Sequence, residues 1–352
     1  MKLIRKTLLA LVLFAFAFNS YSYKFDTIVS FGDSLSDNGN LYAYMAHFIP
    51  KSPPYYHGRF SNGPVWTEDL FQSYFPNGAS DNFQDFAVGG AGAVLSYKEN
   101  LPYTLSSEVD DYLYLHNYVN KDTTLYTIWI GANNYLNGPT NVDAITTSVV
   151  DAIGTNVESL INNGAVMILI VNIPDLGKTP AAAQNNTQEL LTELANKHNE
   201  KLFAKYNELK ERYPNVNIAY FDVYSLFNQL MSNPGQFNIT NTTQPCYSGG
   251  FSLRAVANNP ELLNKYLDTQ AKQYHLVLDE QKKQAILANP VLKEALIVGY
   301  QDQSLPKLNA TSNSCTGDLF WDHVHPTAPI HQLIAQYAKS TLDEAGFQPI
   351  TK

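Results

Sequence analysis

The apolar residues of this chain fall into short and long segments that alternate along the sequence. The short segments are mostly apolar without a polar residue at every second position, as in strands buried on both faces of a sheet, and each stops at Gly, Asn, Pro or Asp: residues 26–31, 83–88, 125–130, 166–171 and 216–221. The long segments have helical periodicity and cover residues 64–74, 105–118, 142–162, 187–213 and 328–345. This alternation predicts an α/β fold, a doubly wound sandwich around a parallel sheet of about five strands.

Residues that could take part in catalysis or binding come directly after three of the predicted strands. Ser34 follows the first, the Gly89-Gly90 pair follows the second, and Asn133 follows the third. In open α/β sheets the ligand site lies beyond the carboxyl ends of the strands. We therefore expect these three segments to meet at one rim of the sheet.

The regular alternation stops between about residues 232 and 317. The edges of this interval are rich in Asn, Thr, Gln, Pro and Gly, and its middle contains a helical stretch at residues 260–294. Since no linker composition marks a domain boundary, we interpret the interval as an insertion, packed over or beside the rim, within a single domain of residues 23–352.

The first 22 residues have the pattern of a secretory signal peptide. Lys2, Arg5 and Lys6 precede an apolar run at residues 8–18, and small residues follow. The alternative is a retained membrane anchor, but the run is shorter than the ~20 residues that a spanning helix needs. We expect cleavage after Ser22 and a secreted protein.

The net charge bears on the class of partner, and the cysteines bear on a disulfide. The formal net charge is −9, and phosphate binding needs a basic face, so we expect no nucleic-acid partner. The two cysteines, Cys246 and Cys315, both fall in the proposed insertion or at its edge. In an exported chain we expect them to form a disulfide, with two free buried thiols as the alternative.

Two segments at opposite ends of the chain offer the parts of a nucleophilic site. Gly32 permits a sharp turn after a strand, which would expose the hydroxyl of Ser34, although a serine in this place is by itself more typical of a helix cap. The segment does not match the Gly-x-Ser-x-Gly elbow of the α/β-hydrolases. Near the other end, Asp322 stands three residues before His325, where one local turn would let its carboxylate hold the Nδ1 proton, with Pro326 opening the last helix.

The Asp322-to-His325 segment also allows a metal site. Asp322, His323 and His325 could ligate zinc, but no further His, Asp or Cys cluster at recognised zinc spacing accompanies them. We therefore predict no metal and leave His323 without a role.

Five sequence blocks, in order, resemble those of the GDSL (SGNH) hydrolases. The resemblance is to the bacterial branch of secreted phospholipases and lysophospholipases A, thermolabile haemolysins and glycerophospholipid:cholesterol acyltransferases. It spans residue 25 to about residue 340, and the blocks are FGDSLSDNGN (31–40), GRFSNGPVW (58–66), FAVGGAG (86–92), IWIGANN (128–134) and DHVH (322–325). It implies a flavodoxin-like three-layer SGNH sandwich and ester chemistry without a cofactor.

The resemblance also implies roles for individual residues. Ser34 matches the nucleophile, with Asp322 and His325 as the other members of its triad. The oxyanion hole would consist of the N–H of Ser34, the N–H of Gly90 or Gly89, and the amide of Asn133. The family block Gly-x-Asn-Asp ends here in Asn134, which leaves open the contact that the Asp would make.

The substrate follows from the family branch rather than from composition. The branch implies phospholipid or lysophospholipid substrates, peripheral contact with lipid aggregates, and a sterol as a further acyl acceptor. The alternatives are an esterase for acylated carbohydrates or simple esters on the same fold, and a secreted binding module without turnover.

Overall fold

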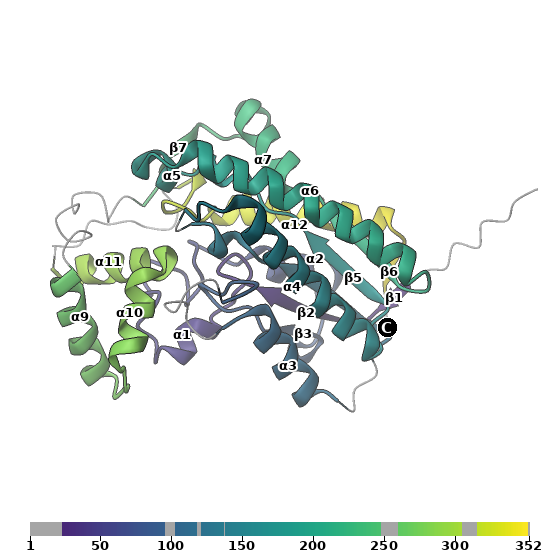
Figure 1. Cartoon of the computed structure of the whole chain (residues 1–352), viewed down its shortest axis with the longest axis horizontal. Helices are drawn as coiled ribbons and strands as arrows, with labels where there is room; N and C mark the ends of the chain where they lie inside the picture. Colours follow the sequence, from purple (N-terminus) through teal and green to yellow (C-terminus); the bar gives the residue numbers. More distant parts are fainter. Residues whose placement is uncertain are drawn as a thin grey trace, which may run out of the picture.

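Five parallel strands form the central sheet in the order β3-β2-β4-β5-β6 (Figure 1). The computed structural model describes residues 23–95, 103–117, 121–136, 138–247, 260–304 and 315–350, so the predicted signal peptide lies outside the described residues. The strand order is the flavodoxin-like one, in which the first strand pairs with the second and the third. The predicted α/β fold is therefore confirmed. The strands are β2 (Thr27–Gly32), β3 (Phe83–Asp85), β4 (Thr124–Trp129), β5 (Met167–Val171) and β6 (Asn217–Phe221).

The sheet is covered on both faces, which explains the continuous apolar runs in the sequence. Every residue of β4 and β5 is buried, and successive side chains of β2 enter different cores, Ile28 on one face and Val29 and Phe31 on the other. One face packs against α3 (Leu105–Leu115), α4 (Val142–Asn162) and α6 (Gln188–Arg212). The other packs against α2 (Trp66–Tyr74), α7 (Val223–Ser232) and α12 (Ala328–Glu344).

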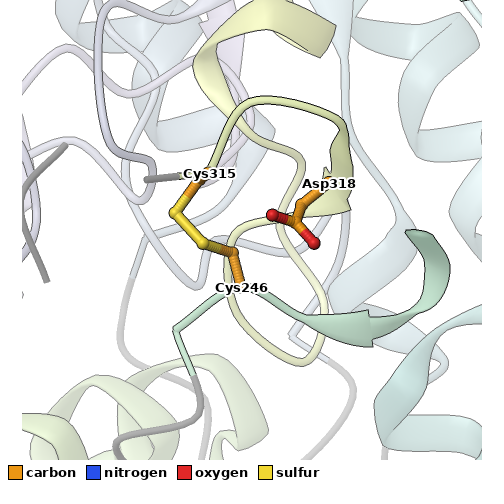
Figure 2. A group of neighbouring side chains, drawn as sticks. All are labelled: Cys246, Cys315 and Asp318. Atoms are coloured by element: carbon orange, nitrogen blue, oxygen red, sulfur yellow. A yellow bond between two sulfur atoms is a disulfide. The ribbon is translucent and has the colours of Figure 1, made fainter. Parts of the chain in front are cut away.

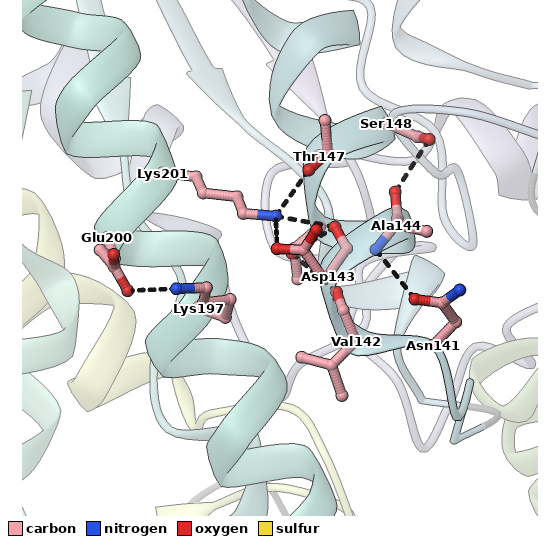
Figure 3. Close-up of polar contacts among 10 residues, drawn as sticks. Asn141, Val142, Asp143, Ala144, Thr147, Ser148, Lys197, Glu200 and Lys201 are labelled. Carbon is pink, nitrogen blue, oxygen red and sulfur yellow. Dashed lines mark hydrogen bonds and ion pairs between the residues drawn. The ribbon is translucent and has the colours of Figure 1, made fainter.

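A salt bridge from Lys201 joins the outer surfaces of α4 and α6 beside the N-terminal cap of α4. Lys201 of α6 donates to the carbonyl and the carboxylate of Asp143 and to the hydroxyl of Thr147, and Asn141 caps α4 by accepting from the N–H of Ala144 at 3.1 Å (Figure 3). Because these side chains are exposed, they add little to stability. The apolar contacts beneath them hold the two helices together. No helix in the described ranges combines the length and the hydropathy needed to cross a membrane.

Two sequence-based expectations about helices were wrong. The single stretch at 260–294 is three helices, α9 (Pro260–Gln273), α10 (Glu280–Ala288) and α11 (Pro290–Ser304), because His275 takes a positive φ of 55°, Asp279 caps α10 and Pro290 cannot continue it. Pro326 does not open the last helix, which begins at Ala328. It instead extends the loop before α12, forming a bridge with Phe320 and accepting a hydrogen bond from Ser61.

Two small sheets flank the central one. β1 (Tyr23–Phe25) pairs with β9 (Phe347–Pro349), and β7 (Asn241–Pro245) pairs with β8 (Asp318–Phe320). The Cys246–Cys315 disulfide lies at the second pair, as Figure 2 shows, so the expected bond is confirmed. It fixes β7 beside the chain that leads into Asp322.

We expect the Cys246→Ser/Cys315→Ser double variant to lose about 4 kcal/mol of unfolding free energy. The bond closes a sequence separation of 69 residues, and a loop of this length restricts the unfolded chain strongly. Equilibrium urea unfolding under non-reducing conditions measures the difference. A thiol reductant should bring the wild type to the value of the variant and leave the variant unchanged. A double variant as stable as the oxidised wild type would contradict the expectation.

Candidate active site

Ser34 lies in the tight turn that follows β2. Asp33 organises this turn, because its carbonyl accepts from the N–H groups of Ser36 and Asp37 and its carboxylate accepts from the N–H of Leu35. Gly32 ends the strand where only a glycine fits, since a Cβ atom there would lie 2.4 Å from the carbonyl oxygen of Trp129. The close approach of β2 and β4 therefore fixes the direction in which Ser34 leaves the sheet.

The segment from Asp322 to His325 folds back on itself and faces this turn. Asp322 Oδ1 accepts from the N–H groups of Val324 at 2.9 Å and His325 at 2.8 Å, and its Oδ2 lies 2.7 Å from His325 Nδ1. The other ring nitrogen, His325 Nε2, lies 2.8 Å from Ser34 Oγ. The structure thus joins the three residues in one chain of hydrogen bonds, although Ser34 and His325 are 291 positions apart.

Asp322 is fully buried, so its charge depends on its hydrogen-bond donors. Burial by itself raises the pKa of this carboxyl, but His325 and the two backbone N–H groups outweigh burial and hold the pKa below its ordinary value. The hydroxyl of Tyr55 donates to Oδ2 as well, at 2.7 Å. Asp322 is therefore an anion at neutral pH and can hold a proton on His325 Nδ1.

The remaining predicted residues are linked beside Ser34. Asn133 lies in the short helix η2 (Ala132–Asn134), and its amide donates to the carbonyl of Ala91 at 3.0 Å. The N–H of Gly89 donates to Asp37 Oδ2 at 2.7 Å, whereas Gly90 takes the positive φ of 82° that favours glycine. Because Gly89 is engaged in this way, the geometry favours Gly90 for the role that the sequence left open between them.

A mainly apolar pocket opens at Ser34. Ser34, Asn133 and His325 line it, while Gly90 adjoins them through Ala91 without lining it. The apolar part of the wall comes from several elements: Leu35, Trp129, Leu136, Leu176, Phe227, Met231, Val291, Phe320 and Val324. Such a lining suits a hydrocarbon chain. A further polar part of the wall consists of Asp175, Lys178, Thr179 and Asn228.

Comparison with known proteins agrees with this arrangement. The sequence model of the GDSL-like lipase/acylhydrolase family matches residues 28–338. The chain belongs to this family. A GDSL acylhydrolase is an esterase or acyltransferase, so the predicted enzyme class is confirmed.

Three curated relatives illustrate the range of the family. The phosphatidylcholine-sterol acyltransferase of Aeromonas hydrophila is 33% identical over 325 residues, which cover 91% of this chain and 90% of that one. The secreted effector protein SseJ of Salmonella typhimurium is 28% identical over 67% of this chain and 56% of its own length. The thermolabile hemolysin of Vibrio parahaemolyticus is 28% identical over 62% of this chain and 50% of its own length.

Several supporting residues of this GDSL acylhydrolase were not found from the sequence. The carboxylate of Asp37 accepts from the N–H groups of Gly39, Asn40, Leu41 and Gly89, which ties the loop of Ser34 to the glycine pair. Burial raises the pKa of Asp37 to about 6, although these N–H groups partly offset the effect. In the local sequence, an aspartate before Asn-Gly-Asn is typical of an ordinary turn. Its second role, joining this loop to Gly89, is visible only in the structure.

The departure at Asn134 has a clear structural reason. Its Oδ1 accepts from the N–H of Ala93 and its Nδ2 donates to the carbonyl of Val94, both at 2.8 Å. An Asp could accept the first bond but, when ionised, could not donate the second. Asn134 therefore fastens the segment after Gly90 to the block that contains Asn133.

The loop between α10 and α11 also reaches this region. Asn289, between α10 and α11, is buried and donates to the carbonyl of Gly90 at 3.0 Å, while its Oδ1 accepts from the N–H groups of Val291 and Leu292. One amide thus caps α11 and contacts a predicted oxyanion residue. The sequence contained no signal for this contact, because Asn289 and Gly90 are far apart along the chain.

Asp322, His323 and His325, the alternative zinc site of the sequence analysis, are not among the ligating groups that lie close together in the described residues. In the described part of the chain, the group of ligating atoms within metal-binding distance of one another is Cys246, Cys315 and Asp318, all within 4.8 Å (Figure 2). The two sulfur atoms are bonded to each other, so neither is a thiolate ligand. Asp322 and His325 instead use their ring and carboxylate atoms on each other and on Ser34.

His198 supports the Asn133 segment from beneath. It is fully buried in α6, and its Nδ1 lies 2.8 Å from the hydroxyl of Tyr135, which directly follows η2. Burial lowers the pKa of His198 to about 3. The folded protein therefore keeps this ring neutral, whereas the unfolded chain protonates it near pH 6.5.

We expect His198→Gln to reduce the loss of stability in acid. Because the unfolded state binds a proton that the folded state refuses, His198 lowers the unfolding free energy as pH falls from about 6.5 toward 3, by up to about 1.4 kcal/mol per pH unit. Asp33 and Asp37, whose folded pKa values are raised by burial to about 7 and about 6, act in the opposite direction, so the difference from wild type isolates His198.

Urea unfolding at pH 7, 6, 5 and 4 measures this difference. The control is His275→Asn, which changes an exposed histidine and keeps a residue that tolerates its positive φ. Equal pH slopes for wild type and His198→Gln would contradict the expectation.

Proposed function

We propose that this GDSL acylhydrolase is a secreted serine esterase that cleaves fatty-acyl esters of phospholipids or lysophospholipids through an acyl-enzyme. The observation that carries the proposal is the chain of two hydrogen bonds from Ser34 through His325 to Asp322, at 2.8 and 2.7 Å. A hydroxyl, an imidazole and a buried carboxylate in this order are the parts of an activated serine nucleophile.

In the first step, Ser34 Oγ attacks the ester carbonyl while His325 Nε2 takes its proton. Asp322 stays ionised, holds the Nδ1 proton of His325 and stabilises the imidazolium that forms. Two backbone N–H groups donate to Asp322 Oδ1 and hold its carboxylate in place beside His325. His325 then returns the proton to the leaving alcohol as the acyl-enzyme forms.

The negative charge on the carbonyl oxygen needs donors that are already in place. We assign the N–H of Ser34, the N–H of Gly90 and the amide of Asn133 to this oxyanion hole. The Asn133 amide carries two hydrogens, and its bond to the carbonyl of Ala91 uses one of them and fixes the direction of the other. Loss of one such donor typically costs about 10²- to 10³-fold in rate.

The acyl-enzyme has two proposed fates. Water, activated by His325, releases a fatty acid, and a sterol hydroxyl attacking the same carbonyl gives acyl transfer. The named activity of the Aeromonas relative, aligned over 91% of this chain, supports the sterol as a second acceptor. The apolar pocket wall favours an acyl chain over the sugar of a carbohydrate ester. Such substrates sit in aggregates, so we propose peripheral contact with a lipid surface.

Export is part of the proposal. A disulfide persists in oxidising compartments, and the chain contains one. We therefore keep residues 1–22 as a signal peptide with cleavage after Ser22, and a single mature domain of residues 23–352 with an insertion at about 232–317.

We expect Ser34→Ala to abolish release of fatty acid from lysophosphatidylcholine and of p-nitrophenol from p-nitrophenyl esters, by at least about 10³-fold. Only the nucleophile is removed, so binding of the lipid should persist. The assay is run with and without cholesterol, and cholesteryl ester as a product identifies acyl transfer. Equal low rates for wild type and Ser34→Ala would refute the proposed esterase activity and favour the alternative of a binding module without turnover.

We expect His325→Ala, but not His323→Ala, to remove the same activity. His325 contacts both Ser34 and Asp322, whereas the backbone carbonyl of His323 accepts from the N–H of Ala181. The two variants change the same residue type two positions apart, which makes each the control of the other. Activity that depends on His323 and survives the loss of His325 would contradict the assigned base, and inhibition by a chelator would favour the zinc alternative.

A further inference from the structure

Asp322 receives a hydrogen bond that a three-residue triad does not require. Tyr55 donates its hydroxyl to Asp322 Oδ2 at 2.7 Å, and the same oxygen lies 2.7 Å from His325 Nδ1. One carboxylate oxygen therefore accepts from the base and from a tyrosine 267 positions away in the sequence. Both Tyr55 and Asp322 are buried, at 2% and 0% exposure, so water does not compete for this bond.

The ring of Tyr55 is held firmly. It packs edge-on against Trp321 and Phe60, each with ring centroids 6.0 Å away, and it belongs to a small core with Cys315. Phe60 in turn lies 5.1 Å from the ring of His325. Tyr55 thus touches the residue before Asp322, and Phe60 connects it to the base.

We propose that Tyr55 is a positioning residue for ester cleavage, which fixes the Asp322 oxygen that orients His325 and shares its negative charge. This inference rests on the proposed function. The phenol carries no proton to the substrate and acts only through Asp322. Its effect is on where the carboxylate points and on how much of its charge faces the imidazole.

The physical consequence of losing the hydroxyl has a definite sign. Without Tyr55, Oδ2 keeps one donor, His325, so more of the negative charge of Asp322 acts on the ring. A stronger opposite charge favours the imidazolium, which raises the pH needed to free the base. The carboxylate also gains freedom to rotate away from His325, which lowers the rate of the chemical step more than it lowers substrate binding.

A purely structural role would have different consequences. A buried tyrosine hydroxyl needs a partner wherever it lies, and Asp322 could merely be the nearest acceptor. The chain contains a tyrosine–carboxylate bond of the same length outside the site: Tyr74 is buried and donates to Asp343 Oδ1, also at 2.7 Å, although Asp343 is exposed and pairs with Lys339. Removing that hydroxyl costs a tyrosine–carboxylate bond of the same length without touching the triad.

The test compares Tyr55→Phe with Tyr74→Phe in the full chain with its disulfide intact. The substrate is p-nitrophenyl butyrate, which dissolves in water, and kcat and KM are measured from pH 4.5 to 9. For Tyr55→Phe we expect kcat to fall about tenfold with KM within about twofold, and the acidic limb of the kcat/KM profile to move up by about half a pH unit or more. Tyr74→Phe should give the wild-type profile.

A double-mutant cycle shows whether Tyr55 acts through Asp322. In an Asp322→Ala background, Tyr55→Phe should change the residual rate by less than about twofold, because its partner is absent. This arm needs only a measurable residual rate, and circular dichroism spectra establish that each variant is folded. An equal fall in the two backgrounds would show that Tyr55 acts independently and would overturn the inference.

The outcomes separate this inference from the proposed function. An active wild type with an unshifted profile in Tyr55→Phe would overturn the role of Tyr55 alone, as would a loss of thermal stability equal to that of Tyr74→Phe with no change in kcat. A wild type that neither cleaves the ester nor reacts with a fluorophosphonate at Ser34 would overturn the proposed function, and this inference with it.

Discussion

An ionised carboxylate inside a dry core persists only where donors surround it, and the arrangement at Asp322 meets this requirement. Two backbone N–H groups, the ring of His325 and the hydroxyl of Tyr55 all reach its two oxygens. The two N–H groups and the imidazole come from the local turn, and the hydroxyl comes from the loop near residue 55. The need to satisfy one buried charge thus ties together segments that are remote in sequence.

A second buried carboxylate, that of Asp37, does the same for the loops that follow the first two strands of the central sheet. Asp37 binds N–H groups of its own loop and of Gly89, while Asn134 fastens the residues after Gly90 to the Asn133 block. These bonds fix the loops after three strands relative to one another before any substrate binds. A site that stabilises developing charge benefits from donors already fixed in place, since no reorganisation is then needed during the reaction.

The sequence was sufficient where a local pattern has one physical solution. Strands buried on both faces are mostly apolar, so the five-strand sheet was predictable. The turn at Gly32 and the spacing of Asp322 and His325 indicated the site. Tyr55 and Asn289 had no local signal, because their roles arise from contacts across more than a hundred positions. The expectation of a single helix at 260–294 was wrong because apolar periodicity does not show that Asp279 caps a new helix. The expected place of Pro326 was wrong because its bridge with Phe320 leaves no sign in the local sequence. The sequence does not distinguish Gly89 from Gly90, whereas the structure shows that the N–H of Gly89 already donates to Asp37.

The separation of Ser34 from His325 has a consequence for the life of the chain in the cell. During synthesis the hydroxyl is made early and the imidazole 291 positions later. A polypeptide whose synthesis has not yet reached His325, or one truncated before that residue, lacks the group that would accept the serine proton. A GDSL acylhydrolase assembled in this order has no imidazole beside Ser34 until translation is nearly finished.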